Sequence, residues 1–240
     1  MRTLVALVFF VLVAGCFNVS WDGGEPVEGS GASGSRTVEA DGVRNVRLAA
    51  PGTLVITRGA APLVIEGDAN LVERLEVEVD GESLSIGVPR GQSFRPDLPL
   101  RYRVGVERLS DLEIAGTGRV EASDVETDAL EIEVAGNGAV QMSGLRAEAV
   151  GVHVAGSGDA ELSGKAGRLE IEIAGSGDID AGRLAVDEGT VSIAGSGDVT
   201  VRAREALDVQ IMGSGDVRYY GSPEVSQNVM GAGDVSRAGD

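Results

Sequence analysis

The second half of the chain alternates apolar and polar residues in short segments that return at a nearly constant spacing. Leu130, Ile132 and Val134 are separated by glutamates, and the same pattern returns at residues 150–154 and 169–173. Alternation with a period of two is typical of a β-strand with one buried face. These segments therefore predict strands whose aliphatic side chains all lie on one side.

Each predicted strand leads into a short glycine motif, and seven copies of this motif occur. The copies read IAGTGRV, VAGNGAV, VAGSGDA, IAGSGDI, IAGSGDV, IMGSGDV and VMGAGDV. Glycine adopts positive φ without a Cβ penalty, so the G-x-G core suits a tight turn. The first glycines follow one another at intervals of 18–20 residues, which predicts a repeat architecture. These turn glycines are Gly116, Gly136, Gly156, Gly175, Gly195, Gly213 and Gly231.

A repeat of 18–20 residues has the right length for one circuit of a small coil made of two or three strands. Successive coils would stack at about 4.8 Å and pair their backbones in parallel. A single unit buries almost no surface, so the aliphatic columns make a core only when units stack. The predicted fold class is all-β, with a parallel β-helix (solenoid) as the architecture. An antiparallel β-sandwich or barrel is the alternative.

The strand pattern begins before the first glycine motif. We predict a single head domain over residues 37–240, with irregular N-terminal coils at 37–110 and the seven repeats at 111–240. Asp80-Gly81 is a tight-turn signal and predicts a hairpin around it. Terminal units of solenoids are usually atypical because they cover an open edge.

The N-terminus has the pattern of an export signal. Arg2 precedes an apolar run that is too short to span a bilayer but has the length of a signal-peptide core. The run ends in the letters VAGC, in which Cys16 is the only cysteine, and this ending resembles a bacterial lipobox. In that interpretation residues 1–15 are a lipoprotein signal peptide and Cys16 carries the lipid anchor. The alternative is a plain secretory signal with an incidental cysteine.

The segment after the cysteine predicts a tether and a location. Residues 16–36 are rich in glycine and serine, so we expect a flexible linker after the lipidated Cys16. Phe17 follows the cysteine in place of aspartate, which resembles lipoproteins sorted to the outer membrane. We therefore expect a lipid-anchored protein of the bacterial cell envelope, at the outer membrane, either periplasmic or exposed at the surface.

The charge balance restricts the class of partner. The chain has 38 Asp and Glu residues against 20 Lys and Arg residues, a formal net charge of −18. Binding to nucleic acid without sequence preference depends on cationic contacts to phosphate, so we expect no nucleic-acid partner.

A column of aspartates after the glycine motif is the clearest candidate site. If the coils stack in register, these carboxylates lie about one strand spacing, ~4.8 Å, apart. Such a column could bind calcium, which prefers carboxylate and carbonyl oxygens. The favoured alternative is that each carboxylate accepts backbone N–H groups of its own turn. We therefore predict no cofactor and no metal, with calcium candidates at Asp159, Asp178, Asp198, Asp216 and Asp234.

Catalytic constellations are absent from the sequence. His153 is the only histidine and is predicted to point outward between two valines. It has no second histidine or cysteine for a transition-metal site, and no Ser-His-Asp set is recognisable. Glycosidase chemistry requires two placed carboxyls in a cleft, and the repeats lack the aromatic ladder typical of sugar binding. We therefore predict that the protein is not an enzyme.

Several of these features together resemble a known family. They are the opening from Arg36 to Val46, the turn and strand from Leu71 to Ile86, and the G-S-G-D repeats from Gly156 onward. They resemble the putative auto-transporter adhesin head GIN domain family over about residues 36–240. The resemblance implies an exported β-helical envelope domain, and it carries over no catalytic residue.

The expected function is that of a non-enzymatic, lipid-anchored binding or adhesion module. Its membrane contact would be the N-terminal lipid, and its partner an envelope or surface protein or a glycan. Two alternatives remain at this stage. One is an envelope enzyme acting on polysaccharide, and the other is a self-associating structural or envelope-stress component, which would form a homo-oligomer.

Overall fold

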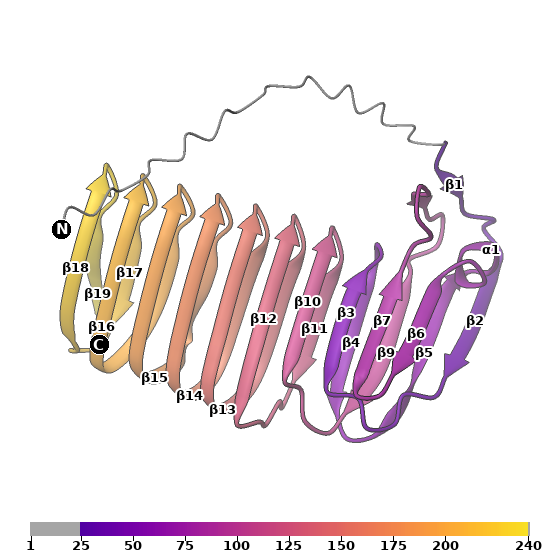
Figure 1. Ribbon diagram of the computed structural model, residues 1–240, viewed down its shortest axis with the longest axis horizontal. Helices are drawn as coiled ribbons and strands as arrows, with labels where there is room; N and C mark the ends of the chain where they lie inside the picture. The colour runs from indigo at the N-terminus through magenta and orange to yellow at the C-terminus, as the bar shows by residue number, and fades with distance from the viewer. Residues whose placement is uncertain (1–24, 240) are drawn as a thin grey trace, which may run out of the picture.

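The computed structural model describes residues 25–239, and its strands wind into a β-solenoid (Figure 1). The predicted parallel β-helix is confirmed, because the strands of each repeat pair in parallel with those of the next. The antiparallel sandwich or barrel is therefore wrong for the repeats. The predicted signal peptide and Cys16 lie outside the described residues. No helix in the described part of the chain is long and apolar enough to cross a membrane.

One circuit of the solenoid, here called a rung, has two long sides that meet at a glycine corner. Strands that lead into the corners form the upstream face, and strands that leave the corners form the downstream face. The long strands from β13 to β16 continue through the lower turn, so each supplies the downstream face of one rung and the upstream face of the next. The strands are β10 (Asp111–Gly116), β11 (Arg119–Ser123), β12 (Ala129–Gly136), β13 (Ala139–Gly156), β14 (Asp159–Gly175), β15 (Ile179–Gly195), β16 (Val199–Gly213), β17 (Val217–Tyr220), β18 (Glu224–Gly231) and β19 (Val235–Gly239).

Inward side chains of consecutive rungs lie over one another and form the core. Along the upstream face the strand register pairs equivalent aliphatic positions from rung to rung, and these residues are at most 2 % exposed. Each buried methylene contributes about 0.8 kcal/mol, so the columns stabilise the stack only in sum. One such column consists of Ile132, Val152, Ile171, Val191 and Val209.

The N-terminal coils belong to the same stack, but their order in space differs from their order in the chain. The strands involved are β3 (Asn45–Ala49), β4 (Thr53–Arg58), β7 (Ser83–Gly87) and β9 (Arg101–Val106). β3 pairs with β7 on one side and with β10 on the other, and β4 lies in the same way between β9 and β11. The coil made of β3 and β4 therefore lies between the coil made of β7 and β9, which comes later in the chain, and the first repeat.

Antiparallel strands close the N-terminal end of the stack. These elements are β2 (Ser33–Val38), β5 (Ala61–Asp68), α1 (Ala69–Val72) and β6 (Glu76–Asp80). β5 pairs antiparallel with both β2 and β9, and α1 packs on β2 and β5 (Figure 1). The predicted hairpin at Asp80-Gly81 is confirmed, because β6 and β7 pair antiparallel around it. The end cap is thus held by antiparallel strand pairs, in contrast to the parallel pairs of the repeats.

The second half of the predicted linker is ordered, which corrects that expectation for residues 25–36. β2 begins at Ser33, and β1 (Val27–Glu28) pairs in parallel with β8 (Phe94–Arg95). The low hydrophobicity of this segment did not predict its order, because hydrogen bonds to distant residues hold it and Val27 is its one side chain packed against the core.

Asp68 is the residue that fixes this segment to the cap. Its side chain is completely buried and accepts backbone N–H bonds from Gly31, Asp97 and Leu98 at 2.8–2.9 Å. Burial alone would raise the pKa of this carboxyl, but these N–H groups hold the pKa below its ordinary value of 3.8. An ionised carboxylate therefore joins β5 to the two loops that cover the end of the stack.

Candidate binding surface

The glycine corners form a single column along the solenoid. At Gly195, φ is +147°, and a Cβ there would overlap the carbonyl oxygen of Gly175 on the preceding rung. The N–H of Ser196 donates to that same carbonyl at 2.9 Å. Glycine is therefore required both for its conformation and for the close approach of two backbones. The strand register places all the predicted turn glycines in this column, each with positive φ: Gly116, Gly136, Gly156, Gly175, Gly195, Gly213 and Gly231.

The five aspartates also form a column, and their hydrogen bonds run between rungs. The N–H of Asp198 donates to Oδ1 of Asp178, and the same bond links each aspartate to the one before it at 2.9–3.1 Å. The interpretation that each carboxylate accepts an N–H of its own turn is wrong. Parallel stacking brings the N–H of the next rung within reach of the side chain, whereas the own-turn N–H is not the partner.

The aspartate column is also the predicted candidate site for calcium. Within residues 25–239, no three or more His, Cys, Asp or Glu side chains are grouped so that they could hold a metal ion. In the carboxylates of Asp159, Asp178, Asp198 and Asp216, Oδ1 already accepts a backbone N–H. These oxygens are thus already engaged, and the prediction that the column binds no calcium is tested by experiment below.

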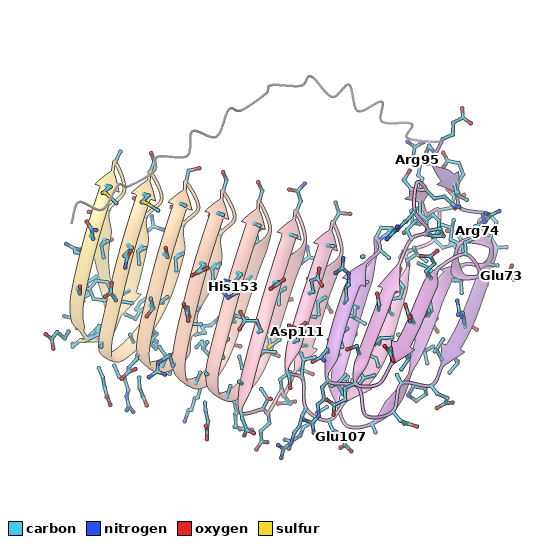
Figure 2. All side chains as sticks on the ribbon, viewed as in Figure 1. Glu73, Arg74, Arg95, Glu107, Asp111 and His153 are labelled. Atoms are coloured by element: carbon cyan, nitrogen blue, oxygen red, sulfur yellow. The ribbon has the colours of Figure 1, made fainter. Side chains whose placement is uncertain are left out.

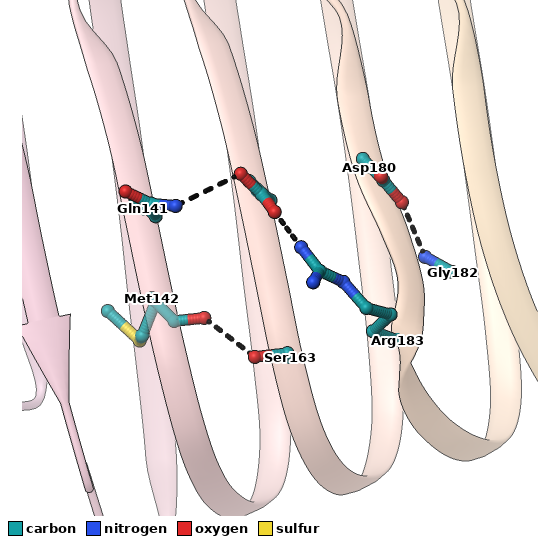
Figure 3. A network of polar contacts seen from close by, with 7 residues as sticks. Gln141, Met142, Ser163, Asp180, Gly182 and Arg183 are labelled. Atoms are coloured by element: carbon teal, nitrogen blue, oxygen red, sulfur yellow. Dashed lines mark hydrogen bonds and ion pairs between the residues drawn. The ribbon is translucent and has the colours of Figure 1, made fainter.

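The downstream face carries polar contacts between neighbouring rungs (Figure 3). Gln141 donates to Glu161 at 3.2 Å, and Glu161 also contacts the guanidinium of Arg183 from the next rung. The hydroxyl of Ser163 donates to the carbonyl of Met142 at 3.4 Å. Glu161 is thus paired with a cation and an amide, and the downstream strands also carry Arg119, Arg202 and Arg218.

The upstream face is different, because its outward positions carry an excess of carboxylates. In one column, Glu113, Glu133, His153 and Glu172 lie on consecutive rungs. Arg47 precedes them and forms an ion pair with Glu113 at 2.7 Å. The adjacent outward column contains Asp111, Glu131, Gly151, Glu170, Thr190 and Asp208.

His153, labelled in Figure 2, has a carboxylate on each side. Its Nδ1 is 3.1 Å from Oε2 of Glu172, and its Nε2 contacts Oε1 of Glu131. The carboxylate of Glu131 occupies the space above Gly151, where a Cβ would overlap it. The predicted outward position of His153, in the column of Glu172, is confirmed, but its contact with Glu131 was not foreseen. This contact could have been predicted from Gly151, a glycine in a column that otherwise carries larger polar residues, because the missing side chain leaves space beside His153.

The negative charges of this face affect one another. Partial burial raises the pKa of Asp111, and the nearby charges of Glu133, Glu113 and Glu131 raise it further. A carboxylate whose ionisation is opposed by its neighbours lies in a negative potential. A cation or a hydrogen-bond donor brought to this face would lower the electrostatic energy.

A shallow depression of about 420 Å³ runs beside His153 on the upstream face. Its rim includes Glu133, His153, Glu172 and Ser192, which follow one another along the outward column. Its floor is a neighbouring column of short side chains. These floor residues are Ala135, Ala155, Ala174 and Ala194.

The chemistry of this depression is that of recognition. Ionised carboxylates only accept hydrogen bonds, so the rim offers acceptors to a donor-rich or cationic partner. The floor offers apolar contact along several rungs. We call the depression and its carboxylate rim the acidic groove.

The family model described as putative auto-transporter adhesin, head GIN domain, matches residues 44–223. Among curated proteins, none matches the chain at a significant level.

Solved structures from Bacteroides and Parabacteroides species have the same fold. A putative adhesin from Bacteroides fragilis superposes with a TM-score of 0.80 at 24% identity, over 88% of this chain and 99% of that chain. A putative lipid binding protein from Parabacteroides distasonis gives a TM-score of 0.72 at 23% identity, over 89% and 100% of the two chains. A putative adhesin from Parabacteroides merdae gives 0.68 at 20% identity, over 88% and 98%. At these identities the likeness establishes the fold.

Proposed function

The chain belongs to the putative auto-transporter adhesin head GIN domain family, and on that premise we propose that it is a non-enzymatic binding module of the bacterial cell envelope. In this proposal Cys16 carries the lipid that anchors the protein, most simply at the outer membrane. The solenoid is the head that meets the partner, and the acidic groove is the surface of contact.

The observation that supports this function is the upstream face itself. Its outward side chains lie one above another at the strand spacing, so the face is long and carries carboxylates on several successive rungs. Such a surface suits contact with an extended partner along several rungs. The partner we propose is an envelope or surface protein, or a glycan, that presents cationic or hydrogen-bond-donating groups.

Binding of the full chain, purified in detergent, to isolated envelope fractions and to surface glycans tests this proposal. We expect binding that weakens as salt rises, because exposed charges separated by more than ~10 Å are screened at 0.1 M salt. The variant Glu133→Gln with Glu172→Gln should bind about tenfold more weakly.

A matched control removes the same charge elsewhere. Glu121→Gln with Glu148→Gln changes two exposed carboxylates away from the groove and should bind as the original chain does. Equal binding by the groove variant and the control variant would exclude the acidic groove as the contact surface. Release of shortened glycans by the purified protein would instead support the polysaccharide-acting enzyme.

A further inference from the structure

The two ends of the solenoid are built differently. The N-terminal end is covered by α1 and the antiparallel strands, whereas at the opposite end β18 and β19 pair on one side only within the described residues (Figure 1). β18 is eight residues long, and all of them except Val225 are exposed. Its outer edge therefore presents a row of unpaired backbone N–H and C=O groups, which is a template for another strand.

Exposed apolar side chains gather at this same end. Four large apolar side chains are exposed in residues 25–239, and three of them are Met212, Val229 and Met230. Met212 and Met230 pair across adjacent rungs and continue the column that is alanine in the acidic groove. The fourth, Val79, lies on β6. Apolar surface is thus concentrated around the upper part of the last rung.

Charge decreases toward this end of the upstream face. Ser226 lies in the outward column that carries Glu170 and Asp208 on earlier rungs, and Asn228 lies in the column that carries Glu172. β18 has no charged residue after Glu224. In a chain of net charge −18, a second copy would meet the least repulsion here.

Polar side chains close the interior of the last rung. Gln227 follows Val209 in an inward column, and Arg237 follows Tyr219 in another. Arg237 donates to the carbonyl of Gly221 at 2.7 Å. The end of the core is therefore partly polar, while Val229 of the inward column of Ile211 stays exposed, and a partner would contact it together with the strand edges and the methionine rim.

The directions of the two last strands indicate how a second copy would fit. β18 runs toward the glycine corner and β19 runs away from it, so a two-fold axis parallel to these strands sets β18 of one copy against β19 of the other, antiparallel. In this arrangement the upstream edge strand of each copy lies against the downstream edge strand of the other, and the exposed end of the last rung is covered in both copies.

We propose that the C-terminal rung is a self-association surface, through which two copies of this chain join tail to tail by pairing β18 with β19. The arrangement is isologous, so both free edges are satisfied at once. Growth stops at two copies, because the other end of each solenoid is capped by antiparallel strands. The two β1 strands lie at the outer ends of the dimer.

The mass of the full chain in detergent, measured by light scattering over a range of concentrations, tests this proposal. We expect a dimer that dissociates on dilution. Ser226→Asp restores a carboxylate on the edge strand and should raise the Kd of the dimer at least about tenfold. Thr190→Asp introduces the same charge in the same column at mid-stack and should leave the Kd unchanged.

A second pair of variants distinguishes loss of the contact from loss of folding. Met230→Glu places a charge on the exposed methionine rim and should weaken the dimer. Val79→Glu changes the exposed valine of β6 and should leave the dimer unchanged, and urea denaturation of each variant checks that it folds. A monomer at all concentrations, larger open assemblies, or a Kd that does not change in Ser226→Asp would overturn the proposal. A monomer that binds a strand of a different protein at this edge would overturn it as well.

Discussion

The carboxylate of Asp178 accepts the backbone N–H of Asp198, which belongs to the next rung, at 2.9 Å. A side chain of one repeat is thereby bonded to the main chain of the following repeat, beside the ordinary β-ladder. The bond fixes which residue lies over which, since a shift by one residue would bring a glycine or an apolar residue to this position. The aspartate of the motif thus specifies register as well as adding charge.

This ladder predicts different effects for two substitutions of one residue. Asp178→Asn keeps the acceptor oxygen and removes one of several like charges, so the free energy of unfolding should stay within about 0.5 kcal/mol of the original. Asp178→Ala removes the acceptor and should lower that free energy by about 1–2 kcal/mol. Asp234 ends the column, so Asp234→Ala is the control and should cost less than Asp178→Ala. Urea denaturation measures all three, and an equal loss for the two alanine variants would contradict the ladder.

Calcium should leave the stability of the protein unchanged. In four of the five carboxylates, Oδ1 already accepts a backbone N–H. We therefore expect the same Tm in EDTA and in millimolar calcium. A Tm that rises with calcium in the original chain, and does not rise in Asp198→Asn, would instead establish a calcium site in the column.

Alanine at a corner glycine should cost more stability where a neighbouring backbone is in the way than where only a positive φ has to be kept. Gly116→Ala meets open space but keeps a positive φ, and should cost about 1–3 kcal/mol. Gly195→Ala adds an overlap with Gly175 and should cost more. Gly87→Ala meets neither constraint and should change the free energy of unfolding by less than about 0.5 kcal/mol. Equal losses at positions 116 and 195, by urea denaturation, would show that backbone contact between rungs does not matter.

Two buried or partly buried carboxyls should give stability opposite dependences on pH. The pKa of Asp68 is lowered in the folded state, so its contribution is fully present above its ordinary pKa of 3.8 and is lost as the pH falls through the folded value. The pKa of Asp111 is raised, so its ionisation opposes folding at neutral pH.

Asparagine variants at positions 68 and 111 test these two pH dependences. Asp68→Asn should destabilise the protein at neutral pH, and the difference should shrink in acid. Asp111→Asn should be neutral or slightly stabilising at neutral pH. Urea midpoints measured at several pH values decide the matter, and a constant penalty for Asp68→Asn at every pH would contradict the assignment.

Lipidation at Cys16 predicts a simple labelling result. The original chain, expressed in a bacterium, should incorporate labelled palmitate and partition into the detergent phase. Cys16→Ser should lose the label and remain unprocessed, because the sulfur that carries the lipid is gone. Label on the Cys16→Ser protein, or none on the original, would favour a plain secretory signal.

The repeats could be predicted from sequence because each depends on local pattern. The spacing from Gly156 to Gly175 already required one corner to lie above another, and the alternating strands required an aliphatic interior. The position of β3 could not be predicted in this way, because nothing local in it selects β7 and β10 as neighbours. The contact of His153 with Glu131 also escaped prediction, since it depends on the empty space above Gly151 on a neighbouring strand.

The enclosed position of β3 and β4 has a consequence for how the molecule is assembled. These strands are made before both of their neighbours, so the first coil of the chain begins with two unsatisfied edges. One edge is paired only when β7 and β9 (residues 83–106) have been made, and the other only when the first repeat, from residue 111, has been made. Folding that starts from this coil therefore proceeds in two directions. In one direction the stack ends after a few strands at the antiparallel cap, and in the other it grows by one rung at a time as the repeats are synthesised.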